Sequence, residues 1–137
     1  MFVPLKTHNV LDYVVGAALI VTPYIFGFAE ILAARNAFLA LGFAMIAYSS
    51  LTDYYYSVAK IIPLGLHMGL DVAVGLITMF APWIFSYNLA LTGGQMAVHW
   101  ILGLGAIGLV SLTKPRTEAE KIRMGEDVKI ASSRRAA

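Results

Sequence analysis

The sequence predicts an all-α polytopic membrane protein with four transmembrane helices, arranged as two tandem parallel-repeat helical hairpins. Three observations lead to this fold class. Hydrophobic residues make up 59% of the 137 residues and charged residues only 13%, about half of the roughly 25% that soluble domains carry. The chain contains four apolar stretches of near-membrane length. The first half of the chain also recurs, in part, in the second half.

The few charged residues are concentrated at the C-terminal end. Of the 18 charged residues, 11 lie in the last 25 positions, and we expect residues 114–137 to form a cytoplasmic charged tail. The remaining seven charged residues are Lys6, Asp12, Glu30, Arg35, Asp53, Lys60 and Asp71. A water-soluble surface cannot be built from so few, so residues 1–113 are predicted to form a four-helix transmembrane domain whose solvent is lipid.

The four apolar stretches run over residues 10–28, 36–51, 68–87 and 96–112. Crossing about 30 Å of hydrocarbon takes about 20 helical residues, so the second and fourth stretches are minimal. We expect the second to extend over residues 32–35. No stretch has a polar face to turn toward water, which argues against the helices of a soluble bundle.

The positions of Lys and Arg predict that both termini are cytoplasmic. Four crossings place the termini and the connection at residues 52–66 on one side, together with Lys6, Lys60 and the basic tail, whereas the other side has only Arg35. Aromatic residues fit two interfacial belts. The outer belt is Tyr24, Trp83, Tyr87 and Trp100, and the inner belt is Tyr13, Tyr48 and the three tyrosines at 54–56.

The chain repeats itself at an offset of about 60 residues. At an offset of 59 the matches are His8 with His67, Asp12 with Asp71, Gly16 with Gly75, and Pro23 with Pro82. At an offset of 61 they are Gly42 with Gly103 and residues 50–52 with 111–113. The two-residue change is placed most simply at Gly93 and Gly94. Two hairpins, at about 8–54 and 67–113, are therefore predicted to be related by a pseudo-twofold axis along the membrane normal.

The repeat carries a family resemblance. Thr22-Pro23-Tyr24 and Ala81-Pro82-Trp83 each close the first helix of a hairpin. They resemble the Ser-Pro-Trp element of the SPW-repeat family of small bacterial integral membrane proteins. The resemblance covers residues 8–113 and implies a multi-pass location in the bacterial inner membrane, but no established reaction. Neither copy is literal: the first keeps a hydroxyl at Thr22 but has Tyr24 in place of Trp, and the second has Ala81 without a hydroxyl but keeps Trp83.

The pairs His8/Asp12 and His67/Asp71 are the candidate functional residues. An i, i+4 spacing puts both side chains of a pair on one helix face, and ionisable groups in membrane segments are costly. One interpretation is a proton relay or a divalent metal site between the hairpins. The other is structural, with each Asp in the first helical turn complementing the helix dipole and each His satisfying it at the interface.

Pro23 and Pro82 remove a backbone donor near the outer interface. The structural interpretation is a bend or stop, with Tyr24 or Trp83 anchored in the headgroups. The functional interpretation is a broken helix that lines a cavity.

Small residues favour close helix packing in lipid. We expect Gly16, Gly42, Gly75 and Gly103, together with Gly105 and Gly108, to pack inside the bundle; a dimer seam is the alternative. His99, near the outer start of the fourth stretch, is expected to be an interface residue.

In the tail, Thr117 and Glu120 suggest a capping box and Gly125 a helix stop. The sequence therefore predicts a short helix over residues 118–124 with disorder beyond it. The basic residues of the tail are expected to hold to anionic lipid, and partner docking is the alternative.

The sequence argues against conventional enzymes and predicts no cofactor. It has no cysteine, which excludes thiolate chemistry, and it has no nucleotide-binding loop, HExxH element or hydrolase triad. No nucleic-acid partner is expected; the partners are the lipid bilayer and a homo-oligomer or larger membrane assembly. Three functions remain: a structural or accessory membrane module, an oligomeric small-molecule or ion transporter or channel that uses the two pairs, and a membrane enzyme or metal site at the same pairs.

Overall fold

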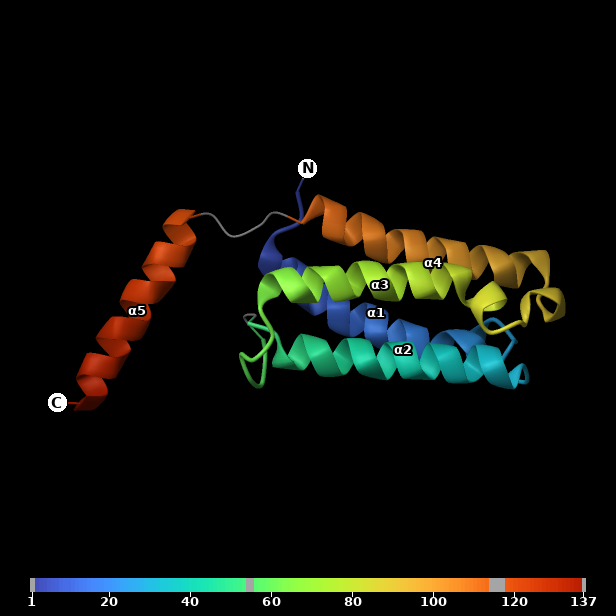
Figure 1. Cartoon of the computed structure of the whole chain (residues 1–137), viewed down its shortest axis with the longest axis horizontal. Helices are drawn as coiled ribbons and strands as arrows, with labels where there is room; N and C mark the ends of the chain where they lie inside the picture. Colours follow the sequence, from blue (N-terminus) through green and yellow to red (C-terminus); the bar gives the residue numbers. More distant parts are fainter. Residues whose placement is uncertain (1, 54–55, 114–117, 137) are drawn as a thin grey trace.

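The computed structural model describes residues 2–53, 56–113 and 118–136, and this part of the chain is almost entirely helical (Figure 1). The elements, in order, are α1 (Leu5–Ile25), α2 (Leu32–Leu51), α3 (Leu64–Ile84), the short 3-10 turn η1 (Asn88–Ala90), α4 (Gly93–Leu112) and α5 (Glu118–Ala136).

Helices α1 to α4 form an antiparallel bundle of two hairpins (Figure 1). Helix α1 packs chiefly on α2 and α3 on α4, α2 contacts α3 between the hairpins, and α1 touches α4 lightly. The helices therefore follow one another around the bundle, with α1 and α3 diagonally opposite. The N-terminus and the connection between the hairpins share one end, hereafter the linker end, and the two hairpin loops share the other (Figure 1).

The helix bounds repeat with the offsets found in the sequence. Helices α1 and α3 begin and end 59 residues apart, and α2 and α4 begin and end 61 residues apart. The extra two residues therefore precede Gly93 and lie in the loop that contains η1, not at Gly93 and Gly94 as we expected. Those two glycines begin α4, behind a Thr92 capping box with Gln95.

Both first helices begin earlier than their apolar stretches. Pro4 and Pro63 are their N-caps, with nearly identical extended backbone angles, and proline at a helix start costs no hydrogen bond because the first N–H groups have no intrahelical partner. Asp12 and Asp71 consequently lie in the third turn, and neither helix has an acidic residue in its first turn. The interpretation of these carboxylates as first-turn partners of the helix dipole is therefore wrong.

Pro23 and Pro82 lie in the last turn of α1 and α3, which end two residues later. The chain then turns through a positive φ at Gly27 and Ser86, again 59 residues apart. The prolines thus stop the first helix of each hairpin and do not break it inside the span.

Glycines lie at the crossing of the two helices within each hairpin. A Cβ on Gly42 would stand 2.6 Å from the carbonyl oxygen of Gly16, and one on Gly103 would stand 2.5 Å from that of Gly75. Backbone meets backbone here, so no side chain fits. A Cβ on Gly105 or Gly108 would meet no other atom within 4 Å, so the expectation that these two glycines pack inside the bundle is wrong.

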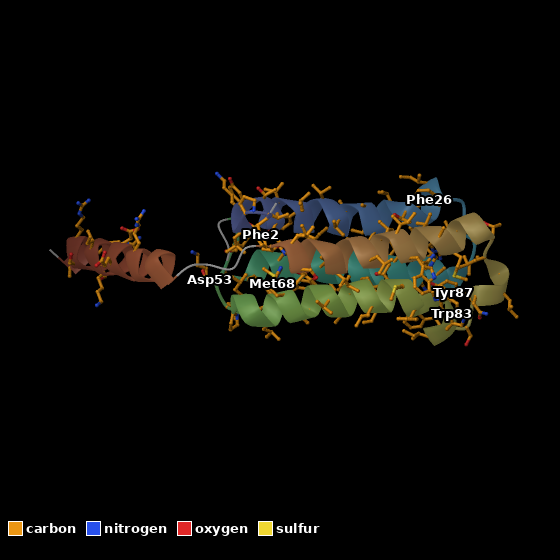
Figure 2. All side chains as sticks on the ribbon, turned by 90° about the horizontal axis from the view of Figure 1, so that it is seen from above. Phe2, Phe26, Asp53, Met68, Trp83 and Tyr87 are labelled. Atoms are coloured by element: carbon orange, nitrogen blue, oxygen red, sulfur yellow. The ribbon has the colours of Figure 1, made fainter. Side chains whose placement is uncertain are left out.

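Within the described part of the chain, three helices, α2, α3 and α4, are long and apolar enough to cross a membrane. Helix α1 is as long as α3, but it carries Lys6, Asn9 and two members of the His/Asp pairs in its first two to three turns. The fourth span therefore remains a prediction. The side chains that radiate from the bundle are largely apolar (Figure 2), as lipid contact requires.

The tail differs from its prediction. Helix α5 continues through Gly125 to Ala136, so neither a stop at Gly125 nor disorder beyond it is found. A glycine inside a helix costs only about 1 kcal/mol relative to alanine, and good helix formers such as Glu126 and Lys129 follow it. Thr117, half of the expected capping box, lies outside the described residues.

Candidate functional site

The structure brings both His/Asp pairs together at the linker end of the bundle. His8 and Asp12 from α1 meet His67 and Asp71 from α3 across the diagonal, and we call these four side chains the polar quartet. Each is at most 1% exposed. One ligand atom from each residue lies within 4.8 Å of all the others, so the quartet is a single site.

The histidines cross from one hairpin to the other. His8 Nε2 lies 3.1 Å from Asp71 Oδ2 and 3.3 Å from Asp12 Oδ1. His67 Nε2 lies 3.1 Å from Asp12 Oδ2 and 3.1 Å from Asp71 Oδ2. The Nε2 atom of each histidine therefore faces both carboxylates at nearly equal distance. A purely local role, in which each His serves only the Asp of its own helix, does not describe this arrangement.

Two threonines orient the imidazoles by contacting Nδ1, the ring nitrogen that does not face the carboxylates. Thr52 Oγ1 lies 2.8 Å from His67 Nδ1, and Thr113 Oγ1 lies 2.5 Å from His8 Nδ1. Each hydroxyl already donates its hydrogen to the carbonyl four residues earlier in the chain. A hydroxyl has only one hydrogen, so each threonine accepts from Nδ1–H. Both histidines are thus held with Nδ1 protonated and Nε2 directed at the carboxylates.

The two carboxylates have unequal surroundings. Tyr48 of α2 donates a 2.6 Å hydrogen bond to Asp71 Oδ1. At the offset of 61, the residue of α4 that corresponds to Tyr48 is Leu109, which has no hydroxyl. Asp12 Oδ1 is accordingly buried without a hydrogen-bond partner. The four members of the quartet are therefore repeated symmetrically, but only one of the two carboxylates accepts a hydrogen bond from a tyrosine.

Backbone connections close the linker end over the quartet. The amide of Val3 donates to the carbonyl of Leu112, and the amide of Asp53 to that of Ile62. These bonds belong to two parallel bridges, Val3 with Thr113 and Ile62 with Thr52, which correspond to each other at the repeat offsets. Each bridge fixes the threonine that holds one histidine.

The residues of the Ser-Pro-Trp-like elements lie at the opposite end. Figure 2 places Trp83 and Tyr87 at the far end of the bundle from Phe2 and Asp53. Tyr24 and Trp83 are 57% and 47% exposed, consistent with the interfacial anchoring expected of them. Thr22 donates its hydroxyl hydrogen to the carbonyl of Ala18. The structure does not bring these residues into contact with the quartet.

Two residues that were expected at the outer interface are buried instead. His99 is fully buried, and its Nε2 lies 3.0 Å from the hydroxyl of Tyr87, which is only 4% exposed. The carbonyl of Gln95 accepts from His99 Nδ1. Burial raises the pKa of Tyr87, so its hydroxyl keeps its proton and donates to His99. The counterparts of Tyr87 and His99 in the first hairpin are Phe28 and Phe38, and both of these rings pack on His99.

Sequence reasoning missed three residues that support the quartet. The repeated Ser-Leu-Thr at 50–52 and 111–113 was a usable signal for Thr52 and Thr113, because identical polar residues at both ends of the repeat indicate one shared contact. Tyr48 had no such signal, since its counterpart is Leu109. It was expected at the inner interface, but it is 9% exposed and points into the site.

The four ligand atoms can do two things chemically. They can share protons along His–Asp hydrogen bonds, or they can coordinate a metal ion through two imidazole nitrogens and two carboxylates. Either arrangement joins the two hairpins through their first helices.

Comparison with known proteins identifies a family but no individual relative. A family model described as the SPW repeat domain matches residues 6–114, which is most of the chain. No curated protein and no solved structure matches the chain.

Proposed function

The chain belongs to the SPW repeat family of membrane proteins, and from this premise we propose that it is a structural or accessory module of the bacterial inner membrane. The observation that carries the proposal is the burial of the polar quartet, whose members are at most 1% exposed. Their polar atoms face one another and the threonines behind them. Polar groups buried in this way hold the two hairpins together and are not accessible to a substrate.

We place the linker end in the cytoplasm. The N-terminal end of α1, the inter-hairpin connection and the C-terminal end of α4 share that end (Figure 1), and so do Lys6 and Lys60. Among the described residues of the bundle, Arg35 is the one lysine or arginine toward the opposite end. Positive charge in short flanking segments is retained on the cytoplasmic side.

We propose that α1 is the fourth span. It has the same 21-residue length as α3 and the same bounds at the repeat offset. Three of the polar residues that lower its hydropathy, His8, Asn9 and Asp12, are fully buried, and Lys6 is exposed in the first turn of the helix. A helix whose polar side chains are buried among other helices presents an apolar surface to lipid.

We further propose that the two hairpins arose by duplication, within a transmembrane domain at residues 1–113 that precedes a tail at 114–137. The support is that equivalent contacts recur at the same offsets. One glycine crossing occurs within each hairpin, and the threonine–histidine contacts and the backbone bridges each occur as two equivalent contacts between the halves.

An accessory role requires a partner, and we propose that it is a second copy of this chain or a larger membrane assembly. Helix α4 is the least covered of the three apolar spans. Its exposed side carries Ile101 and Leu104 beside the open Gly105 and Gly108. Small residues on an open helix face permit close approach of another helix in lipid.

The alternative is a transporter or channel that uses the quartet, and a flux assay separates the two. Full-length protein in proteoliposomes is expected to give no proton or potassium flux above that of empty vesicles. Asp12→Asn, which neutralises one carboxylate, should leave this baseline unchanged. Flux in the native protein that is lost in Asp12→Asn would overturn the structural role in favour of transport.

A further inference from the structure

We infer that the polar quartet is a structural metal site that binds one divalent first-row transition-metal ion, of the Zn²⁺ class, and thereby locks the two hairpins together. The ligands are His8 Nε2, His67 Nε2, Asp71 Oδ2 and the carboxylate of Asp12. The inference goes beyond the structural role proposed above, because that role also holds for a metal-free bundle.

The distances fit a central ion. Zn²⁺ binds His nitrogen and carboxylate oxygen at about 2.0–2.2 Å in tetrahedral sites, which sets ligand atoms about 3.4 Å apart. The four histidine–carboxylate distances in the quartet run from 3.1 to 3.3 Å. These histidine–carboxylate distances are close to the spacing of ligand atoms around one ion, and one ligand atom from each of the four residues lies within 4.8 Å of the others.

The near-equality of these distances favours an ion over hydrogen bonds. A single N–H donates well in one direction, since hydrogen bonds weaken steeply as the donor angle falls. His67 Nε2, however, lies 3.1 Å from an oxygen of each carboxylate, and His8 Nε2 likewise faces both. A metal ion at the centre satisfies all four contacts at once.

The histidines are prepared for this role by their threonines. Because Thr52 and Thr113 accept from Nδ1–H, each neutral imidazole presents an unprotonated Nε2 to the centre. Metal-ligating histidines characteristically donate their other ring N–H to an oxygen in this way, which fixes the tautomer and the ring orientation.

Charge supports a divalent ion. Two ionised carboxylates and two neutral imidazoles carry a net charge of −2, and burying that charge inside a membrane bundle is costly. One divalent cation cancels it. Any protons held by the four groups are released when the metal binds.

The different hydrogen bonding of the two carboxylates indicates which oxygens would bind the ion. Tyr48 holds Asp71 Oδ1, so Asp71 binds through Oδ2 alone. Asp12 Oδ1 is fully buried, has no hydrogen-bond partner, and lies 3.3 Å from His8 Nε2. An orphaned carboxylate oxygen directed at this centre is the group that a metal ion would satisfy, and Asp12 can supply both oxygens.

The test begins with the full-length native chain, purified in detergent without a histidine tag. We expect elemental analysis to find one equivalent of metal per chain, either as purified or after chelator treatment and reloading with Zn²⁺. Loading with Co²⁺ should give the visible absorption bands of a four- or five-coordinate site, and Zn²⁺ should raise the melting temperature of the chelator-treated protein.

Variants locate the ion. Asp12→Asn and His67→Gln are expected to lose bound metal and the Co²⁺ bands. Tyr48→Phe, which frees Asp71 Oδ1, should keep the stoichiometry but change affinity by about 10- to 100-fold. The matched control is His99→Gln. His99 is also fully buried but lies outside the quartet, so this variant should bind metal as the native chain does.

The inference fails if the native chain, folded and chelator-treated, takes up neither Zn²⁺ nor Co²⁺ and shows no shift in melting temperature. It also fails if metal uptake persists in both quartet variants. The first outcome assigns the quartet to shared protons, and it can be read from the native protein even if every variant misfolds. The flux assay above is unaffected by either result.

Discussion

At the residue scale, the supporting side chains define the quartet as much as its four members do. Thr52 and Thr113 set the tautomers of the two histidines, and Tyr48 occupies one oxygen of Asp71. The contrast between Tyr48 and Leu109 then leaves Asp12 as the carboxylate with an unassigned oxygen. The replacement of a tyrosine by a leucine between the two repeats thus gives the two carboxylates different hydrogen bonding.

Tyr48→Phe tests this support. The variant leaves Asp71 Oδ1 buried without its 2.6 Å hydrogen bond, and an unsatisfied buried acceptor costs about 1–3 kcal/mol. We expect the free energy of unfolding in detergent to fall by that amount. Tyr13→Phe is the matched control, because its hydroxyl donates to the carbonyl of Tyr56 at an exposed position and should contribute within about 0.5 kcal/mol. Equal losses in the two variants would contradict the assignment.

At the element scale, each hairpin depends on the contact of two glycines. Gly16 meets Gly42 where α1 crosses α2, and Gly75 meets Gly103 where α3 crosses α4. At Gly42 and Gly103 the first atom that a side chain would strike is a backbone carbonyl oxygen, which cannot rotate away. The crossing distance of each hairpin is therefore set by the absence of a Cβ.

Gly42→Ala should force α1 and α2 apart. Its new methyl group would stand 2.6 Å from the Gly16 carbonyl oxygen and 2.7 Å from Ile20 Cγ1, and such overpacking costs about 1–3 kcal/mol. The measurement is thermal or denaturant unfolding in detergent.

Gly105→Ala is the control for this variant, since the same methyl group there has nothing within 4 Å. It should be neutral or stabilising by up to about 1 kcal/mol, because alanine is the better helix former. If Gly105→Ala destabilises the protein as much as Gly42→Ala, the glycine crossing is not the cause.

At the scale of the whole molecule, the two ends of the bundle have different tasks. The linker end holds the quartet under two backbone bridges. At the other end lie the C-terminal ends of α1 and α3, the exposed Tyr24 and Trp83, and the buried pair of Tyr87 and His99. Figure 2 shows Trp83 and Tyr87 separated from the linker end by the length of the bundle.

Cysteine labelling tests the proposed topology. The chain has no cysteine, so single substitutions report without background. Tyr24→Cys is expected to react with a membrane-impermeant reagent from the periplasmic side, and Ser132→Cys in α5 only after the membrane is opened. Trp83→Cys should behave like Tyr24→Cys, since the two positions correspond in the repeat. Identical accessibility of positions 24 and 132 would contradict four crossings.

Much of the fold was predictable because lipid and duplication leave strong local signals. Apolar length predicted the helices, and Pro23 and Pro82 predicted where the first helix of each hairpin stops. Helix starts were harder: His8 and Asp12 looked terminal because the polar residues before them concealed the start at Leu5. His99 was misjudged because its partner, Tyr87, lies in the loop between α3 and η1, outside the helix that carries His99.

The sequence by itself determined the membrane character, the repeated hairpin and the four candidate residues, since composition, spacing and self-similarity are properties of the chain alone. Only the tertiary structure decided that His8 meets Asp71 and His67 meets Asp12 across the diagonal, and that Tyr48 completes the site. An i, i+4 spacing fixes which face of a helix carries a pair. How two helices rotate about their axes depends on packing, here on the glycine crossings, and that rotation brings the two pairs together.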